Sequence, residues 1–281
     1  MIERFWLFHC AYARVPSSLI FEDGGWSFIR LPFLGGVAEH SEVGPILLDA
    51  PYCHEGPSNV GSLMGSIMQK AGLVFYERWS VVPRIEELGL RAADVSHILM
   101  THLHYDHTGA MKTLAHARFH LSQREWDAAH EGSAWQAGAR GYARSDFGAL
   151  KHRVELHDDV PHLADSTQGL DILGDGSIEM FSLPGHTPGH CGYRIHLADG
   201  SAVFFAGDAA FANPQIFGKR GLGLLPRTVA TSMGGIDVSL RALRRHLDEH
   251  PADVPIVCHD PELGAQCIAE GPIVYGAQPT K

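Results

Sequence analysis

Five short apolar runs of this 281-residue chain each end directly before a histidine or an aspartate. The runs are Pro45–Leu48 before Asp49, Val95–Thr101 before His102, Ile178–Gly185 before His186, Ala202–Gly207 before Asp208 and Val254–Cys258 before His259. Short apolar runs bounded by turn residues are typical of β-strands. Because sites in layered α/β proteins form just past the carboxyl ends of strands, the pattern predicts polar side chains gathered at one edge of an α/β or α+β layered fold.

The apolar pattern along the whole chain predicts eight strands, including these five runs, and five helices. Strands are predicted at Phe5–Phe8, Phe28–Phe33, Pro45–Leu48, Val95–Met100, Ser177–Leu183, Cys191–Leu197, Ala202–Ala206 and Val254–Cys258. Helices are predicted at Ser58–Ala71, Pro83–Leu88, Thr108–Ala115, Ser122–His130 and Val238–His250. Ser122 with Glu125 three residues later forms a capping-box pattern, which marks a helix start.

Two glycine-rich segments, residues 132–150 and 211–235, show no regular pattern. Long loops inside a compact domain are often lids or binding loops. We therefore expect residues 1–281 to form a single domain with these two segments as lid or insert loops. No internal repeat divides the chain further.

Within the stretch from Thr101 to Gly109, three histidines and one aspartate fill four of the six positions from His102 to His107. His102 and His104 are two residues apart, so in an extended segment both side chains point the same way. Imidazoles and carboxylates without a thiolate are good ligands for zinc, iron or manganese. The candidate ligands are His102, His104, Asp106, His107, His186, Asp208 and His259.

Seven ligands are too many for one tetrahedral ion. Two ions that share Asp208 as a bridge account for all of them, with three histidines on one ion and one aspartate and two histidines on the other. Asp49 is expected to orient one histidine through its free ring N–H. Cys191 and Cys258 are interpreted as small packing residues.

Composition and charge narrow the class of partner. The formal net charge is −10, and the only basic cluster, residues 241–245, is interpreted as a solvated helix surface, so a nucleic-acid partner is not expected. No run approaches the roughly 18 apolar residues of a membrane span. The first residues resemble a signal peptide but lack a positive start, which favours a strand. Five scattered cysteines without a close pair favour a reducing compartment, and therefore the cytoplasm.

The motifs together resemble those of the metallo-β-lactamase superfamily. The residues that carry the resemblance are His102–His107, Pro184–His190, Phe205–Asp208 and Cys258–Asp260. The resemblance spans roughly Pro45 to Asp260 and implies an αβ/βα sandwich of two facing mixed sheets, with helices outside and a dinuclear metal site at one edge. The true β-lactamases lack the bridging aspartate that Asp208 supplies here. The glyoxalase II and N-acyl-homoserine-lactone lactonase branches keep it.

His259–Asp260 and the overall length are most similar to the lactonase branch. This implies a dinuclear metal-dependent hydrolase that opens a lactone ring, N-acyl-homoserine lactone first, by attack of a hydroxide that bridges two divalent ions. Zinc is the expected metal, with iron, manganese and cobalt as alternatives. Asp106 and Asp208 are the expected catalytic residues.

One position departs from the lactonase pattern, because that branch typically has a tyrosine where this chain has Phe211. Phe211, Tyr105 and Tyr142 are predicted to contact the substrate. Either the metals alone or a donor such as Tyr105, Tyr142 or Tyr193 is expected to polarise the substrate carbonyl. The alternatives are a hydrolase of an acyclic ester or thioester, similar to glyoxalase II, and a di-iron redox or oxygen-binding module. The expected partner is a small acyl lactone or ester, and the oligomeric state is open between a monomer and a homodimer.

Overall fold

The structure of the protein is a computed structural model that describes residues 1–52 and 72–276. It contains two β-sheets. The first sheet has the order β13 (Ile273–Gly276), β1 (Ile2–Pro16), β2 (Phe28–His40), β3 (Gly44–Leu48), β5 (His97–Leu99), β6 (Arg118–Ser122) and β7 (Val154–His157), and β4 (Leu73–Phe75) pairs with β1. The second has the order β12 (Asp253–Ile256), β11 (Ala202–Phe205), β10 (Cys191–His196), β9 (Ile178–Ser182) and β8 (Leu170–Asp171).

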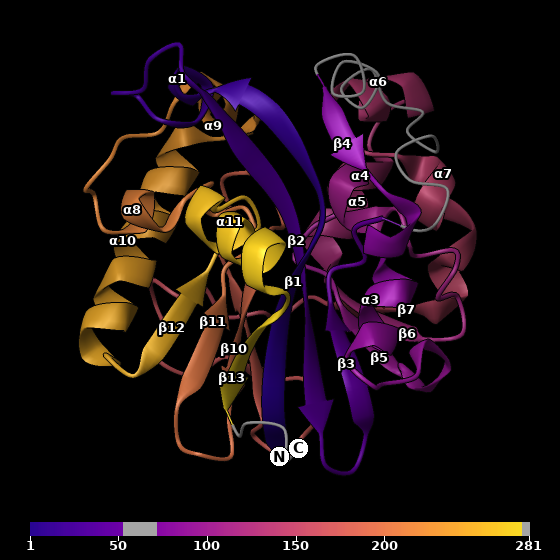
Figure 1. The fold of residues 1–281 in the computed structure, drawn as a ribbon. Coiled ribbons are helices and arrows are strands. Elements are labelled where there is room, and N and C mark those ends of the chain that lie inside the picture. Colours follow the sequence, from indigo (N-terminus) through magenta and orange to yellow (C-terminus); the bar gives the residue numbers. More distant parts are fainter. Residues whose placement is uncertain (53–71, 277–281) are drawn as a thin grey trace.

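Both sheets are mixed. Strands β3, β5, β6 and β7 run parallel, as do β11 and β12, while the remaining pairs are antiparallel. The sheets face each other, and helices cover their outer faces (Figure 1). This arrangement confirms the predicted αβ/βα sandwich.

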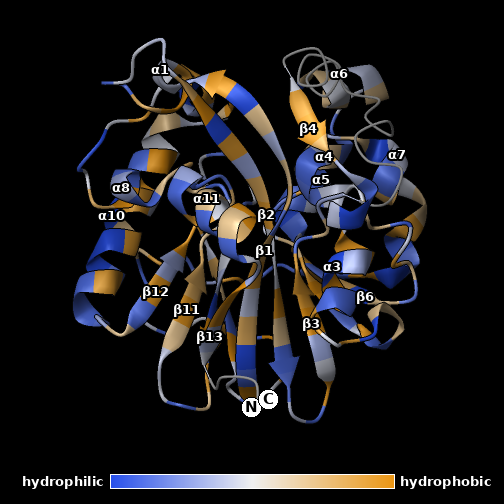
Figure 2. Ribbon diagram, viewed as in Figure 1, coloured by the Kyte–Doolittle hydropathy of each residue, from blue (hydrophilic) through white to orange (hydrophobic). Residues whose placement is uncertain are grey.

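Strand alternation explains the layers. Phe205 of β11 packs between the sheets with Phe5 and Leu48, whereas its neighbour Phe204 packs on the outer face with Leu243. Successive side chains of a strand point to opposite faces, so one strand supplies both clusters. Leu243 belongs to α10 (Met233–Glu249), which covers the second sheet and presents hydrophilic residues outward in Figure 2.

The helices and turns on the first sheet are shorter. They are α1 (Ser17–Ile20), α3 (Val81–Glu87), α4 (Tyr105–Thr108), α5 (Gln123–His130), α6 (Ala134–Ala139), α7 (Arg144–Phe147) and the 3₁₀ turns η2 (Glu77–Trp79), η3 (Ala92–Asp94) and η4 (Gly148–Arg153). Helices α8 (Asn213–Ile216), α9 (Leu224–Val229) and α11 (Pro261–Glu270) complete the described chain. No helix within residues 1–52 and 72–276 is both long and apolar enough to cross a membrane.

All eight predicted strands are present, but β1 and β2 extend far beyond their predicted ends. Strand β1 includes the segment that resembles a signal peptide. The prediction missed β4, β6, β7, β8 and β13. In β6 and β7, polar residues such as His120 and Glu155 hide the apolar pattern. The predicted helices at Pro83–Leu88 and Val238–His250 match α3 and α10, and the one at Ser58–Ala71 lies outside the described residues.

The predicted helix Thr108–Ala115 is wrong, because α4 ends at Thr108 and turns follow. A continued helix would need the His107 carbonyl for the N–H of Met111. That carbonyl instead accepts from Ala50 N, and the Ala50 carbonyl accepts from Ala110 N, both at 2.9 Å. Pairing with the end of β3 therefore replaces helical pairing.

The two segments expected to lack regular structure contain helices, which corrects that expectation. Residues 132–150 hold α6 and α7, and residues 211–235 hold α8, α9 and the start of α10. The signal at α6 is a capping box, with Ser133 at the N-cap and Gln136 three residues later. Whether either segment acts as a lid stays a prediction.

Candidate metal centre

The structure brings the seven candidate ligands into two adjoining groups. His102, His104 and His186 form one group, and Asp106, His107 and His259 form the other; within each, the ligand atoms lie within 4.8 Å of one another. The Asp208 carboxylate contacts both groups: Oδ2 lies 3.3 Å from His186 Nε2, and Oδ1 lies 3.4 Å from His107 Nε2. This is the division expected for two ions that share Asp208.

Strand ends and tight turns position these side chains. His102 follows β5, and His104, Asp106 and His107 lie at the start of α4 or within it. His186, Asp208 and His259 follow β9, β11 and β12. Strands β11 and β12 are parallel neighbours, so their carboxyl ends meet at one edge.

The donor atoms fit a pair of divalent cations. The buried Nε2 atoms of His102 and His107 and the Oδ1 atom of Asp208 have no hydrogen-bond partner among the described residues. His186 Nε2 and His104 Nδ1 face each other at 2.9 Å. Unpaired polar atoms are costly to bury, so several aimed at one place indicate an ion between them. Imidazole and carboxylate donors suit zinc, iron or manganese.

Electrostatics keep the first group ready to bind. Burial holds the pKa of His102 and His186 well below the ordinary value and lowers the pKa of His104 to about 4. At neutral pH these imidazoles are uncharged, which is the form that binds a metal. In the second group burial also lowers the pKa of His107, but the carboxylates of Asp208 and Asp49 outweigh it and raise that pKa above the ordinary value.

Asp49 orients histidines of both groups. Its carboxylate is fully buried, accepts the Thr101 N–H at 2.7 Å and the Thr101 hydroxyl at 2.9 Å, and lies 2.8 Å from His107 Nδ1. The Thr101 Oγ1 atom also lies 3.0 Å from His102 Nδ1. Asp49 adopts a left-handed backbone with φ of 55°. The geometry agrees with the orienting role expected from the sequence.

The segment 132–150 supports His104 from outside. The Tyr105 N–H donates to the Gly141 carbonyl at 3.0 Å, and the His104 ring lies against Gly141. A Cβ on Gly141 would sit 2.9 Å from His104 Cδ2, and the φ of +95° at this position also favours glycine. The α6–α7 segment is therefore part of the wall of the centre.

Sequence reasoning missed two buried residues that hold the ligand loops. Glu125 accepts the backbone N–H groups of Leu103 at 3.0 Å and Gly189 at 3.1 Å, which ties the two histidine-bearing loops together. It was assigned to a capping box, which is only half formed: the Ser122 hydroxyl accepts from Glu125 N, but the Glu125 carboxylate points elsewhere. His190 Nε2 accepts the Asp208 N–H at 3.0 Å, and its place in the motif 184–190 was the available signal.

A pocket of about 410 Å³ opens beside the centre. The predicted substrate contacts Tyr105, Tyr142 and Phe211 all line it, as do Asp106 and Asp208. The apolar wall that the sequence did not reveal comes from β2 and α9 and includes Leu31, Phe33, Leu225 and Val229. A mainly apolar cavity with a few convergent polar groups is typical of a small-molecule site.

The three tyrosines considered as donors differ in their partners. Tyr193 is wrong as a candidate, because it is buried between the sheets and its hydroxyl donates to the Met100 carbonyl at 2.9 Å. Burial and the nearby Glu125 carboxylate raise the pKa of the Tyr142 phenol above the ordinary value. Tyr105 lines the pocket, and burial raises the pKa of its phenol well above the ordinary value, so it stays protonated.

Comparisons with known proteins agree on one family. Residues 68–258 match the sequence pattern described as the metallo-beta-lactamase superfamily. The chain is 32% identical over 188 residues to the N-acyl homoserine lactonase AttM of Agrobacterium fabrum, a match that covers 66% of this chain and 65% of AttM.

Solved structures agree in fold. A variant of AiiA from B. thuringiensis, with N-decanoyl-L-homoserine at its active site, superposes with a TM-score of 0.73 at 17% identity, covering 95% of this chain and 97% of AiiA. AidC, described as a dizinc quorum-quenching lactonase, superposes with a TM-score of 0.62 at 14% identity, covering 99% of this chain and 96% of AidC. At these identities the structural likeness concerns the fold alone.

Proposed function

This chain belongs to the metallo-beta-lactamase superfamily, and from that premise we propose that it is a dinuclear metal-dependent hydrolase that opens a lactone ring, with N-acyl-homoserine lactones as the first substrate class. The observation that carries the proposal is the pair of ligand groups on either side of Asp208, beside an apolar pocket. The names of AttM, AiiA and AidC support the substrate class. The proposed cofactor is two divalent ions, with zinc first.

Two bound ions would supply a water of lowered pKa as nucleophile and would polarise the substrate carbonyl. His102, His104 and His186 would hold one ion, and Asp106, His107 and His259 the other. Asp208 would keep the two charges together, and its carboxylate would carry a proton to the leaving oxygen. Its pKa is well below the ordinary carboxyl value because nearby His259 and His107 outweigh the effect of burial, so it is an anion, the form that binds cations.

The protein groups around the substrate have separate tasks. Phe33, Leu225 and Val229 offer apolar surface for an acyl chain and exclude water. We assign the donor for the carbonyl or leaving oxygen to Tyr105, which lines the pocket with Asp106 and Asp208 and keeps its phenol proton. The ring of Phe211 lies 5.9 Å from that of His186 and 4.7 Å from that of His259, so it closes the pocket over the centre without donating.

Phe211 also favours a second candidate function, hydrolysis of an acyclic ester or thioester by the same residues. A thiolate leaving group needs less hydrogen-bond assistance than an alkoxide, because the thiol has a pKa of about 8.5. A pocket wall without a phenol at this position is therefore a smaller loss for a thioester than for a lactone.

Metal analysis and a substrate panel test the proposal together. Purified protein is assayed for metal content and then for hydrolysis of acyl-homoserine lactones, acyclic esters and thioesters of matched acyl length. Lactone opening with the highest kcat/KM is expected. Thiol release without lactone opening would favour the second candidate, and an iron-dependent visible spectrum that responds to reductant, without hydrolysis, would replace both with the di-iron redox module.

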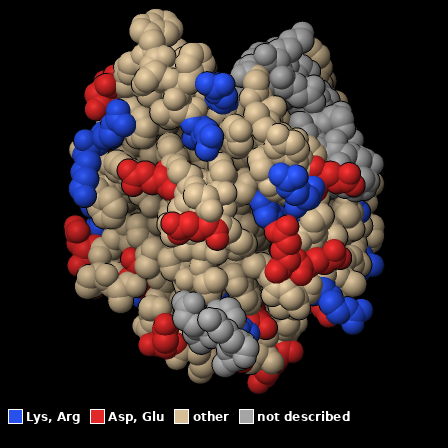
Figure 3. Space-filling view, viewed as in Figure 1, with Lys and Arg blue, Asp and Glu red and all other residues tan. Residues whose placement is uncertain are grey.

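The wider setting is part of the proposal. We infer a small-molecule partner and no nucleic acid, in keeping with the net charge of −10 and with the mixture of acidic and basic side chains on the face drawn in Figure 3. The described cysteines Cys10, Cys191, Cys258 and Cys267 are all free and buried, which fits a reducing compartment and supports a cytoplasmic location.

A further inference from the structure

Three histidines outside the centre line up across the neighbouring strands β5, β6 and β7. His97 Nδ1 lies 2.8 Å from His120 Nε2, and His120 Nδ1 lies 3.2 Å from His157 Nε2. Glu155 sits beside them on β7, and the ligand atoms of His120, Glu155 and His157 lie within 4.8 Å of one another. None of the four residues lines the pocket beside the dinuclear centre.

The spacing suits a transition metal. Two imidazole nitrogens that bind one tetrahedral zinc at about 2.0–2.1 Å lie about 3.3 Å apart. The separation of 3.2 Å between His120 and His157 already matches this value. Their rings are nearly parallel, with an angle of 8° between the planes, and the two nitrogens lie within hydrogen-bonding distance, which accommodates one proton between them. For an ion to take the place of that proton, the His157 ring would turn toward Glu155. His157 would then carry its proton on Nδ1, which leaves Nε2 free to bind the ion.

The contact with His97 offers a way to set the form of His120 that binding needs. If His120 Nε2 donates its proton to His97 Nδ1, its Nδ1 atom presents a lone pair toward His157 and Glu155. Metal-binding histidines almost always donate their other ring N–H in this way. Burial also lowers the pKa of His120 to about 3, and the pKa values of His97 and His157 are lowered as well, so the row is uncharged at neutral pH.

We propose that His120, Glu155 and His157 form a further binding site for a single zinc-class divalent ion, with His97 as the residue that orients His120 and with water in the remaining position. The ion would join β6 to β7, the last strand of the first sheet. Arg118 now pairs with Glu155 at 3.0 Å, but both side chains are largely exposed, with 62% and 43% of their surface open to solvent. Such exposed pairs contribute little and are easily exchanged.

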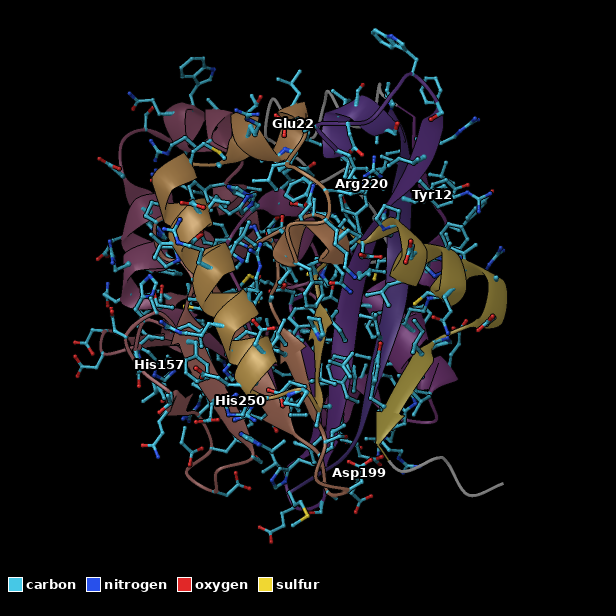
Figure 4. All side chains as sticks on the ribbon, turned by 90° about the vertical axis from the view of Figure 1, so that its left-hand side faces the viewer. Tyr12, Glu22, His157, Asp199, Arg220 and His250 are labelled. Atoms are coloured by element: carbon cyan, nitrogen blue, oxygen red, sulfur yellow. The ribbon has the colours of Figure 1, made fainter. Side chains whose placement is uncertain are left out.

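The site is accessible and separate from the dinuclear centre. His120 is buried, whereas His157 is only half-buried and lies near the left edge of the molecule in Figure 4. With two protein side chains close to solvent and only three ligands, we expect it to bind more weakly than the seven-ligand centre. It would fill when zinc is added, after the dinuclear centre is occupied.

Zinc titration of the zinc-loaded protein tests this site. After loosely held ions have been removed, calorimetry should show one further zinc ion bound per wild-type chain. His157→Gln should abolish this uptake or weaken it at least tenfold. The matched control is His152→Gln, which replaces an exposed histidine on η4 outside the row and should behave as wild type.

Two more measurements separate the explanations. Added zinc should raise the Tm of wild type and of His152→Gln but not that of His157→Gln. If His157→Gln folds poorly, Glu155→Gln provides a second test, because it removes only an exposed carboxylate. Asp208→Asn should still bind the extra ion at His120, Glu155 and His157. The proposed hydrolase activity and this site are therefore tested independently. Equal zinc uptake by wild type, His157→Gln and Glu155→Gln would overturn the proposal and leave the row as a hydrogen-bonded chain only.

Discussion

Replacing Phe211 with tyrosine tests how the pocket polarises its substrate. The ring is 4% exposed, lines the pocket and packs between His186 and His259. Phe211→Tyr adds one hydroxyl to an existing ring, and its backbone N–H remains held by Gln215 Oε1 at 2.9 Å. We therefore expect the fold and the metal content to be unchanged.

The size of the effect follows from two limits. A well-placed donor to a developing oxyanion is worth up to about 3–4 kcal/mol. Here Tyr105 is proposed to supply part of that interaction already, so the new hydroxyl adds one weaker hydrogen bond. We expect kcat/KM for an acyl-homoserine lactone to rise about tenfold, which corresponds to about 1.4 kcal/mol.

The assay compares kcat/KM for one acyl-homoserine lactone between wild type and Phe211→Tyr at equal metal content. The matched control is Phe33→Tyr, which adds the same hydroxyl to another aromatic residue of the pocket, whose ring lies 5.2 Å from that of His259. A similar gain in both variants would mean that added polarity alone raises the rate. An unchanged or lower rate in fully metallated Phe211→Tyr would refute the placement of Phe211 over the reacting carbonyl and would move the ester or thioester function ahead.

The other predictions concern the metals and the residues that hold them. Purified protein should carry at least two transition-metal ions per chain, and removal of them by a strong chelator should abolish hydrolysis; activity that survives in metal-free protein would contradict the dinuclear centre. Asp208→Asn should lose at least one ion and several hundredfold in kcat, about the loss of a major electrostatic element, and near-native turnover with both ions retained would show that Asp208 is not the bridge. Asp49→Asn places an amide N–H₂ where the carboxylate now accepts from Thr101 and faces His107, so metal affinity in a chelator competition should fall about 10–100-fold; equal affinity would exclude the orienting role.

The ligand set illustrates what could be read along the chain. His102, His104, Asp106 and His107 lie within one turn, so their proximity follows from spacing alone. His186, Asp208 and His259 could be added because each directly follows an apolar run, and strand ends meet at one edge. The same logic placed Asp49 beneath the histidines.

The failures occurred where a distant segment competes with a local pattern. Thr108–Ala115 has helical periodicity, but the carbonyl of His107 bonds to Ala50, far away in the sequence. Glu125 occupies a capping-box position, yet the N–H groups of Leu103 and Gly189 take its carboxylate. In both cases the local preference is worth only about 1 kcal/mol, less than the cost of leaving several buried backbone groups unpaired.

The sequence by itself determined which residues could bind metal, since side-chain chemistry and short spacings are properties of neighbouring residues. Only the tertiary structure decided the partners of those residues, the apolar wall that β2 and α9 bring to the pocket, and the row of His97, His120 and His157. That row depends on the parallel order of β5, β6 and β7 and on a register that pairs Leu99 with His120 and His120 with Glu155. Strand order and register are set by how whole faces of the sheets pack against each other, and the sequence of a single strand does not specify which strand pairs with it.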